Sequence, residues 1–206
     1  MWGTKGIDVT DETSKLERDL TVLEAMATEM DEYLRSDILF WPLGDSSFPQ
    51  LTLGGCLMRQ HLLLALRQQL SDAYQQRLDA AVAQFEAALV EKVVAFEGKA
   101  HDEIRARLRQ WNEYLKELRD PSLAAGDYYR SAVETRAMLA ALLSKLESPP
   151  YQLDRRVLNE LASFDRVLAN YWEAGDFIWP EAWAEAYPRQ PFWWLYGRPR
   201  TRAHDS

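Results

Sequence analysis

Residues 14–36 read SKLERDLTVLEAMATEMDEYLRS, and this stretch decides the fold class. Its apolar residues recur every three or four positions, which aligns them along one face of a helix. Ser14 and Glu17 have the spacing of a capping box, in which side chains satisfy the free amides at a helix start. We therefore predict a helix over residues 14–36, with its buried face formed by Leu16, Leu20, Leu23, Ala27, Met30 and Leu34.

Residues 56–97 contain no proline and no glycine and carry a second apolar face, from Leu63 to Phe96. One helix of this length would span about 60 Å at 1.5 Å per residue. Alternatively, Ser71 and Asp72 could cap a second helix and divide the stretch in two; the sequence leaves both possibilities open. Gly98 is the expected stop or kink.

Three more stretches show the same helical spacing: residues 104–118, 128–146 and 157–171. They end before Pro121, Pro149 and Gly175, residues that interrupt helices. Five or six amphipathic helices joined by short loops predict an all-α fold, an antiparallel bundle. We expect a single domain over residues 1–206, with residues 1–12 and 198–206 flexible.

Residues 37–55 break the helical pattern with prolines and glycines but carry Phe40, Trp41 and Phe48. Ile38–Trp41 and Gln50–Leu53 flank the turn residues and could pair as a short hairpin. An ordered apolar loop that covers one end of the bundle is the alternative. In either case we expect this segment to pack against the helices.

The C-terminal segment, residues 171–196, holds ten of the 24 aromatic residues of the chain, among them five of its eight tryptophans. It could be a flap whose rings pack on the bundle. It could also remain partly exposed and bind a partner, because tryptophan and tyrosine are enriched at interface hot spots. The two interpretations are compatible.

The net charge of −8 argues against general nucleic-acid binding, which needs a basic face. Residues 1–37 contain ten acidic and four basic residues. This excess of acidic residues is either a solvated helix face or an acidic surface that binds a basic partner. No apolar stretch is long enough to span a membrane, and MWGTKGIDVTDE lacks the apolar core of a signal peptide. With a single cysteine as well, we expect a cytoplasmic protein.

The sequence contains no recognisable catalytic constellation. Cys56 follows Gly54 and Gly55 at an expected helix start, where free amides lower a thiol pKa and bind anions. His61 lies five residues further on and points to another face. The three histidines form no paired Glu-x-x-His motif of the kind that holds di-iron centres. We predict no catalytic residues, no metal and no cofactor.

These features favour a non-enzymatic helical protein that acts through protein–protein contacts, as an adaptor, assembly subunit or homodimer. The alternative is a small-molecule or anion-binding bundle, with a pocket between the 40–55 loop and the aromatic segment. An enzyme of unknown reaction is the third hypothesis. The candidate partner- or ligand-binding residues are Phe40, Trp41, Phe48, Gly54, Gly55, Trp179, Trp183, Trp193, Trp194 and Tyr196.

Overall fold

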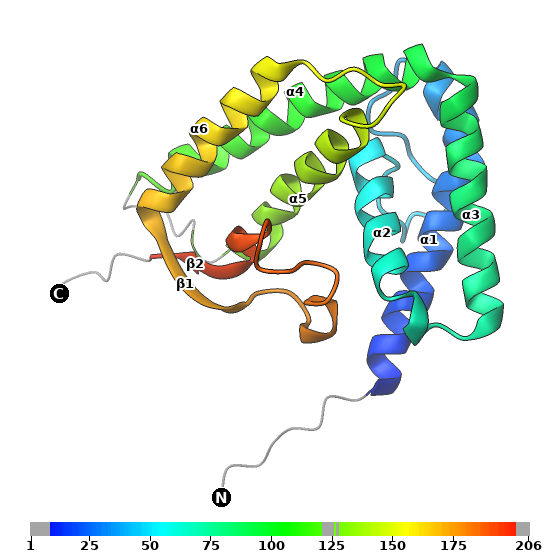
Figure 1. Cartoon of the computed structure of the whole chain (residues 1–206), viewed down its shortest axis with the longest axis horizontal. Helices are drawn as coiled ribbons and strands as arrows, with labels where there is room; N and C mark the ends of the chain where they lie inside the picture. The colour runs from blue at the N-terminus through cyan, green and yellow to red at the C-terminus, as the bar shows by residue number, and fades with distance from the viewer. Residues whose placement is uncertain (1–8, 121–125, 127, 201–206) are drawn as a thin grey trace, which may run out of the picture.

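The chain is mostly helical, as predicted, with one small sheet. The computed structural model describes residues 9–120, 126 and 128–200. Within these ranges the helices and strands are α1 (Val9–Arg35), α2 (Leu53–Ala65), α3 (Asp72–Glu91), α4 (Val93–Glu117), α5 (Tyr129–Leu146), α6 (Arg155–Tyr171), β1 (Trp172–Phe177) and β2 (Tyr196–Pro199) (Figure 1).

The helices form two groups that are inclined to one another (Figure 1). In the first group α1 packs along α3 and also contacts α2. In the second group α4 contacts both α5 and α6. Contacts between α2 and α5 join the two groups, and one cluster of buried apolar side chains runs through all six helices and the C-terminal segment. In the described part of the chain, no helix is long and apolar enough to cross a membrane.

Helix α1 confirms the apolar face predicted for residues 14–36, since all six predicted residues are buried. The predicted start was wrong, because the helix begins at Val9. The Ser14–Glu17 pair therefore lies inside the helix and not at its first turn. Residues 1–8 lie outside the described residues, so only Val9–Glu12 of the expected flexible leader can be assessed, and these are helical.

The long stretch without proline or glycine forms separate helices. Helix α2 ends at Ala65, and α3 begins at Asp72 after the N-cap residue Ser71. The predicted interruption at Gly98 was wrong, because α4 runs through it and the chain breaks instead at Lys92, where φ is −127°. Leu89 and Phe96 are both fully buried on either side of this break. The turn at Lys92 thus lets two helices of different direction bury their apolar faces in one core.

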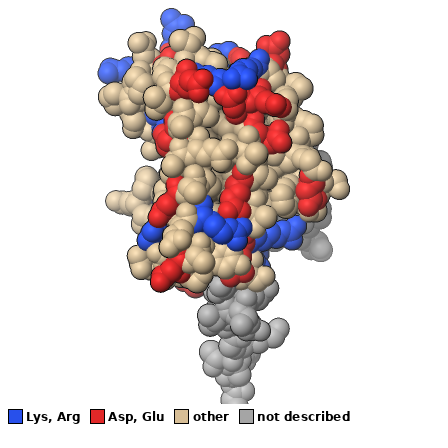
Figure 2. Space-filling view, turned by 90° about the vertical axis from the view of Figure 1, so that its right-hand side faces the viewer, with Lys and Arg blue, Asp and Glu red and all other residues tan. Residues whose placement is uncertain are grey.

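Three acidic residues of α1, Asp19, Glu24 and Asp31, pair with basic residues outside this helix. Glu24 forms an ion pair with Arg77 of α3, and Asp31 contacts Lys92. Figure 2 shows the face on the α3 side of the molecule, where acidic and basic side chains are interspersed instead of forming a patch of one sign. Part of the negative charge of this helix is therefore balanced locally.

Residues 37–52 form an ordered loop with a single β-bridge in place of a hairpin. The bridge joins Trp41 and Leu51. The Trp41 N–H donates to the Leu51 carbonyl at 3.0 Å, and the Leu51 N–H donates to the Trp41 carbonyl at 2.8 Å. The buried ammonium of Lys99 donates to the carbonyl oxygens of Ser36 and Ile38, both at 2.8 Å. These carbonyls lie just after the C-terminal end of α1, where a cation is favourable. Lys99 therefore holds the beginning of the loop on α4.

Residues 172–199 contain the aromatic segment apart from Tyr171. They form a hairpin-like flap in which β1 and β2 pair antiparallel. Trp179, Tyr187 and Trp194 are buried, and the hydroxyl of Tyr129 on α5 donates to the Trp194 carbonyl at 2.6 Å. Gly197 has φ +147°, and a Cβ there would lie 2.2 Å from a backbone oxygen of the partner strand, so the pairing requires glycine. Strand β2 reaches Pro199, inside the stretch expected to be flexible.

Candidate functional site

A groove of about 1010 Å³ lies between α1, α2, the first turns of α5, the loop at 47–49 and the aromatic segment. We call it the aromatic groove. Its walls include Phe48 from the loop and Trp179, Trp183 and Tyr187 from the segment. The loop and the aromatic segment thus line the same groove as α1 and α2, although the two segments are about 130 residues apart in the sequence.

The aromatic wall is held by ring contacts and one hydrogen bond. The Trp179 ring meets Trp183 and Tyr187 edge-on, with centroids 6.1 and 5.0 Å away. Its indole N–H donates to the Arg130 carbonyl at 3.3 Å. Tyr187 also packs against His61 of α2, whose Nε2 lies 2.7 Å from the Ala186 oxygen. These contacts fix the orientation of the rings before any ligand binds.

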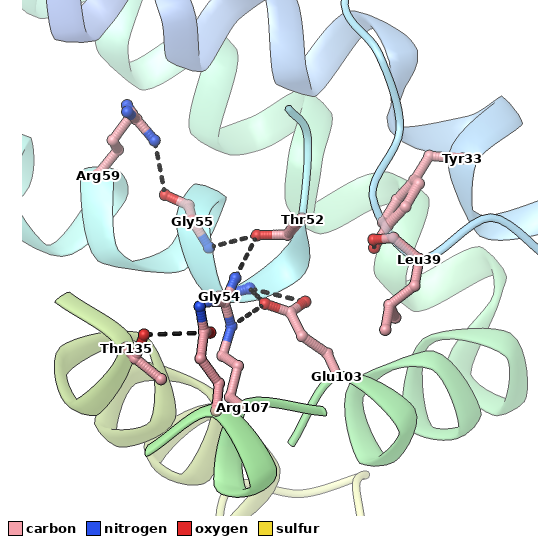
Figure 3. Close-up of polar contacts among 10 residues, drawn as sticks. Tyr33, Leu39, Thr52, Gly54, Gly55, Arg59, Glu103, Arg107 and Thr135 are labelled. Carbon is pink, nitrogen blue, oxygen red and sulfur yellow. Dashed lines mark hydrogen bonds and ion pairs between the residues drawn. The ribbon is translucent and has the colours of Figure 1, made fainter. Parts of the chain in front are cut away.

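Charged side chains also line the groove. The Arg59 Nε lies 3.3 Å from the Asp19 carboxylate, and its Nη1 donates to the Gly55 carbonyl at 3.3 Å (Figure 3). Burial raises the pKa of Asp19 above 3.8, an effect that the attraction of Arg59 offsets only in part. Loss of hydration also raises the pKa of Glu134 on α5, against the opposing attraction of Arg59 and Arg107. The groove therefore holds charges in an environment that is drier than the surface.

The start of α2 does bind an anion, but that anion belongs to the chain itself. The carboxylate of Glu103, on α4, accepts from the Gly54 N–H at 3.0 and 3.1 Å and from Arg107 Nε at 2.6 Å (Figure 3). Glu103 is fully buried and Arg107 nearly so. A negative charge is favourable at a helix N-terminus, and here the charge is an internal one.

Thr52 links this ion pair to the 37–52 loop. Its hydroxyl accepts from the Gly55 N–H at 3.0 Å as the N-cap of α2, and Arg107 Nη2 donates to the same oxygen at 2.9 Å. The network therefore joins the end of the loop, the start of α2 and the middle of α4. This network thereby fixes the position of the loop whose Phe48 side chain lines the groove.

The structure brings together three of the ten predicted binding residues. Phe48, Trp179 and Trp183 line the aromatic groove. Trp41 packs edge-on against Tyr33 at 6.5 Å, and Phe40 is 43% exposed. The other five lie outside the lining, among them the glycines at the start of α2 and the three aromatic residues near β2, namely Gly54, Gly55, Trp193, Trp194 and Tyr196.

Asp19, Arg59, Glu134 and Tyr187 also line the groove but were not among the predicted binding residues. The only signal was the position of Asp19, one residue before the buried Leu20 and at the edge of the apolar face. Arg59 and Glu134 occupy helix positions that look like ordinary charged surface. Their convergence depends on how α1, α2 and α5 pack, which helical periodicity does not specify.

Cys56, His61 and His101 each pack or form hydrogen bonds within the protein, whereas His204 lies outside the described residues. Cys56 is fully buried, and burial raises the pKa of its thiol, so the reactive thiolate is disfavoured. His101 Nδ1 lies 2.8 Å from the Glu97 carbonyl in the preceding turn of α4. Within the described ranges, no group of three or more metal-ligating side chains converges.

Comparison with known proteins identifies no relative of this chain. No protein family model matches the chain, and no curated protein or solved structure shows significant similarity to it.

Proposed function

We propose that the protein binds a small organic molecule with a planar ring in the aromatic groove. The observation that carries this proposal is the convergence of Phe48, Trp179, Trp183 and Tyr187 on one cavity of about 1010 Å³. Ligand pockets typically measure about 300–1,000 Å³ and combine apolar walls with a few polar groups. The groove has this size and this composition.

The order of the groove walls supports binding of a ring. Trp179 is 7% and Tyr187 3% exposed, so their positions are set by packing. Trp183 is half-buried and keeps ring surface accessible at the groove. Prearranged side chains lose less conformational entropy on binding, which favours affinity. A planar ligand can contact Trp183 without a rearrangement of the buried rings behind it.

The test uses phenylnaphthylamine, a neutral planar probe whose fluorescence rises in apolar surroundings. We expect binding to the wild-type protein, and binding at least threefold weaker to Trp183→Ala, because an aromatic contact contributes about 0.5–1.5 kcal/mol beyond its buried area. Trp193→Ala is the matched control, since Trp193 is a half-buried tryptophan of the same segment outside the groove. Equal affinity of all three proteins would contradict the proposal.

Contact with another protein chain is the second candidate function. Val90 and Val94, on either side of the α3–α4 turn, are 68% and 83% exposed. Burial of such side chains against a second copy of the chain would remove apolar area from water. Light scattering after size-exclusion chromatography, over a series of concentrations, tests this proposal. A strict monomer at every concentration excludes the homodimer, whereas a dimer that Val94→Asp dissociates supports it.

A further inference from the structure

The charges that line the aromatic groove differ in sign from the charge of the whole chain. The chain has a net charge of −8. Among the residues that the structure describes, the groove lining contains four basic side chains, Lys15, Arg18, Arg59 and Arg130, and two acidic ones, Asp19 and Glu134. A positive lining in an acidic protein concentrates anions at that site. This observation bears on the chemistry of the ligand and rests on the proposed function.

Arg59 has donors that the protein leaves unused. Its side chain is 17% exposed, and its Nε is buried with no aligned hydrogen-bond acceptor, although the Asp19 oxygen is 3.3 Å away. Its only hydrogen bond in the described part of the chain goes from Nη1 to the Gly55 carbonyl. A guanidinium offers five N–H donors in a planar fork that fits carboxylate and phosphate oxygens. Arg59 lines the groove, and its Nη2 forms no hydrogen bond with a described residue.

Two further arginines at the groove are exposed and unpaired. Arg18, on α1, and Arg130, on α5, line the groove from different helices. Neither forms a direct ion pair with a described residue, although the charge of Arg18 attracts the carboxylates of Asp19 and Asp45. Other arginines of the helices, such as Arg67, Arg77 and Arg136, are each paired with a carboxylate. The unpaired arginines are thus available to a ligand that approaches through the open side of the groove.

We propose that the ligand of the aromatic groove carries an oxyanion group, a carboxylate or phosphate, attached to its planar ring. The ring lies against Trp183, and the oxyanion accepts hydrogen bonds from Arg59 with Arg18 and Arg130 beside it. Asp19 and Glu134 reduce the positive field without cancelling it, because four basic side chains line the same groove. Asp19 already faces Arg59 and holds its guanidinium at the groove.

The first experiment compares two probes that differ only by a sulfonate group: anilinonaphthalene sulfonate and its neutral counterpart phenylnaphthylamine. We expect the anion to bind the wild-type protein about tenfold more tightly, since hydrogen bonds between a charged guanidinium and an oxyanion are stronger than those between neutral groups. Added salt should weaken binding of the anion only. If the neutral probe binds and depends on Trp183 but the anion gains nothing, the groove binds rings and the oxyanion inference is overturned. If neither probe depends on Trp183, the proposed function itself fails.

Arginine variants locate the charge effect. Arg130→Gln removes an exposed groove charge and should weaken anion binding about threefold or more while leaving the neutral probe unchanged. Arg166→Gln, which removes an exposed charge on α6 outside the groove, is the control. Arg59→Lys retains the charge opposite Asp19 but loses the planar fork, so we expect about tenfold weaker anion binding with an unchanged melting temperature. Equal anion binding by the wild-type protein and both groove variants would overturn the inference.

Displacement of bound anilinonaphthalene sulfonate by other compounds tests whether the groove prefers a carboxylate or a phosphate. Naphthoate and naphthyl phosphate should displace the probe more effectively than naphthylmethylamine, which carries the same ring with a positive charge. The stronger of the two anions identifies the ligand as a carboxylate or a phosphate. Stronger displacement by the amine would assign the site to cations through Asp19 and Glu134, and would overturn the proposal.

Discussion

Replacement of Gly54 by alanine should destabilise the protein, although alanine normally favours a helix. A Cβ at position 54 would lie 2.7 Å from the Glu103 carboxylate, 3.0 Å from Met138 Cβ and 3.2 Å from Leu142 Cδ1. The Met138 Cβ is attached directly to the backbone of α5 and cannot rotate away. The Glu103 carboxylate can move, but only by giving up the Gly54 N–H and its alignment with Arg107.

The size of the effect follows from the ion pair that the new methyl group displaces. Breaking a buried pair by removal of one partner costs about 3–5 kcal/mol, because the other charge remains buried. Exchange of glycine for alanine within a helix returns up to about 1 kcal/mol. We therefore expect the free energy of unfolding to fall by about 3 kcal/mol. For a chain of 206 residues this lowers the melting temperature by roughly 10 °C.

Gly98→Ala is the matched control for this prediction. Gly98 lies within α4, and a Cβ there would meet nothing within 4 Å. Its alanine variant should be more stable by about 0.5–1 kcal/mol, because alanine loses less backbone entropy on folding. Urea unfolding followed by circular dichroism measures both variants. A Gly54→Ala protein as stable as Gly98→Ala would refute the role given to the buried carboxylate.

Four further perturbations test other parts of the structure. Deletion of residues 177–206 should abolish cooperative unfolding, because it removes several buried aromatic residues at about 3–5 kcal/mol each; a thermal melt with an unchanged midpoint would show that the segment is not core. Tyr129→Phe leaves the buried Trp194 carbonyl without its donor and should cost about 1–3 kcal/mol in urea unfolding. The raised pKa of Asp19 means that its proton stabilises the folded state fully below pH 3.8, and this stability is lost as the pH rises through the folded pKa. Asp19→Asn should remove that pH dependence, so parallel stability–pH curves for the two proteins would count against it. Cys56, the single cysteine, should react with a thiol reagent only in denaturant, and rapid labelling of the native protein would contradict its burial.

The helical face of residues 14–36 shows what periodicity can predict. Every residue of that face is buried, because a spacing of three and four aligns side chains on a helix regardless of what packs against them. The helix start was less predictable, since the capping-box pattern at Ser14 also fits the interior of a longer helix. The break at Lys92 had no local signal of the proline or glycine kind, and it depends on the directions in which Leu89 and Phe96 reach the core.

The candidate site was predicted only in outline. The sequence indicated that the loop before α2 and the aromatic segment could meet, and Phe48, Trp179 and Trp183 do line one groove. The charged residues of that groove were not predictable, because Asp19, Arg59 and Glu134 come from three helices whose relative rotation is a tertiary property. For the same reason the sequence showed two glycines at a helix start but not that Glu103, 49 residues later, binds there.

The sequence by itself determined the helical class, the buried face of α1 and the concentration of aromatic residues in the last part of the chain. These are properties of short segments, set by side-chain periodicity and by composition. Only the tertiary structure decided where the helices turn, which charges are buried, and that loop, helices and aromatic segment enclose one groove. These features depend on contacts between residues that are distant along the chain, and such contacts form only when all six helices share a single core.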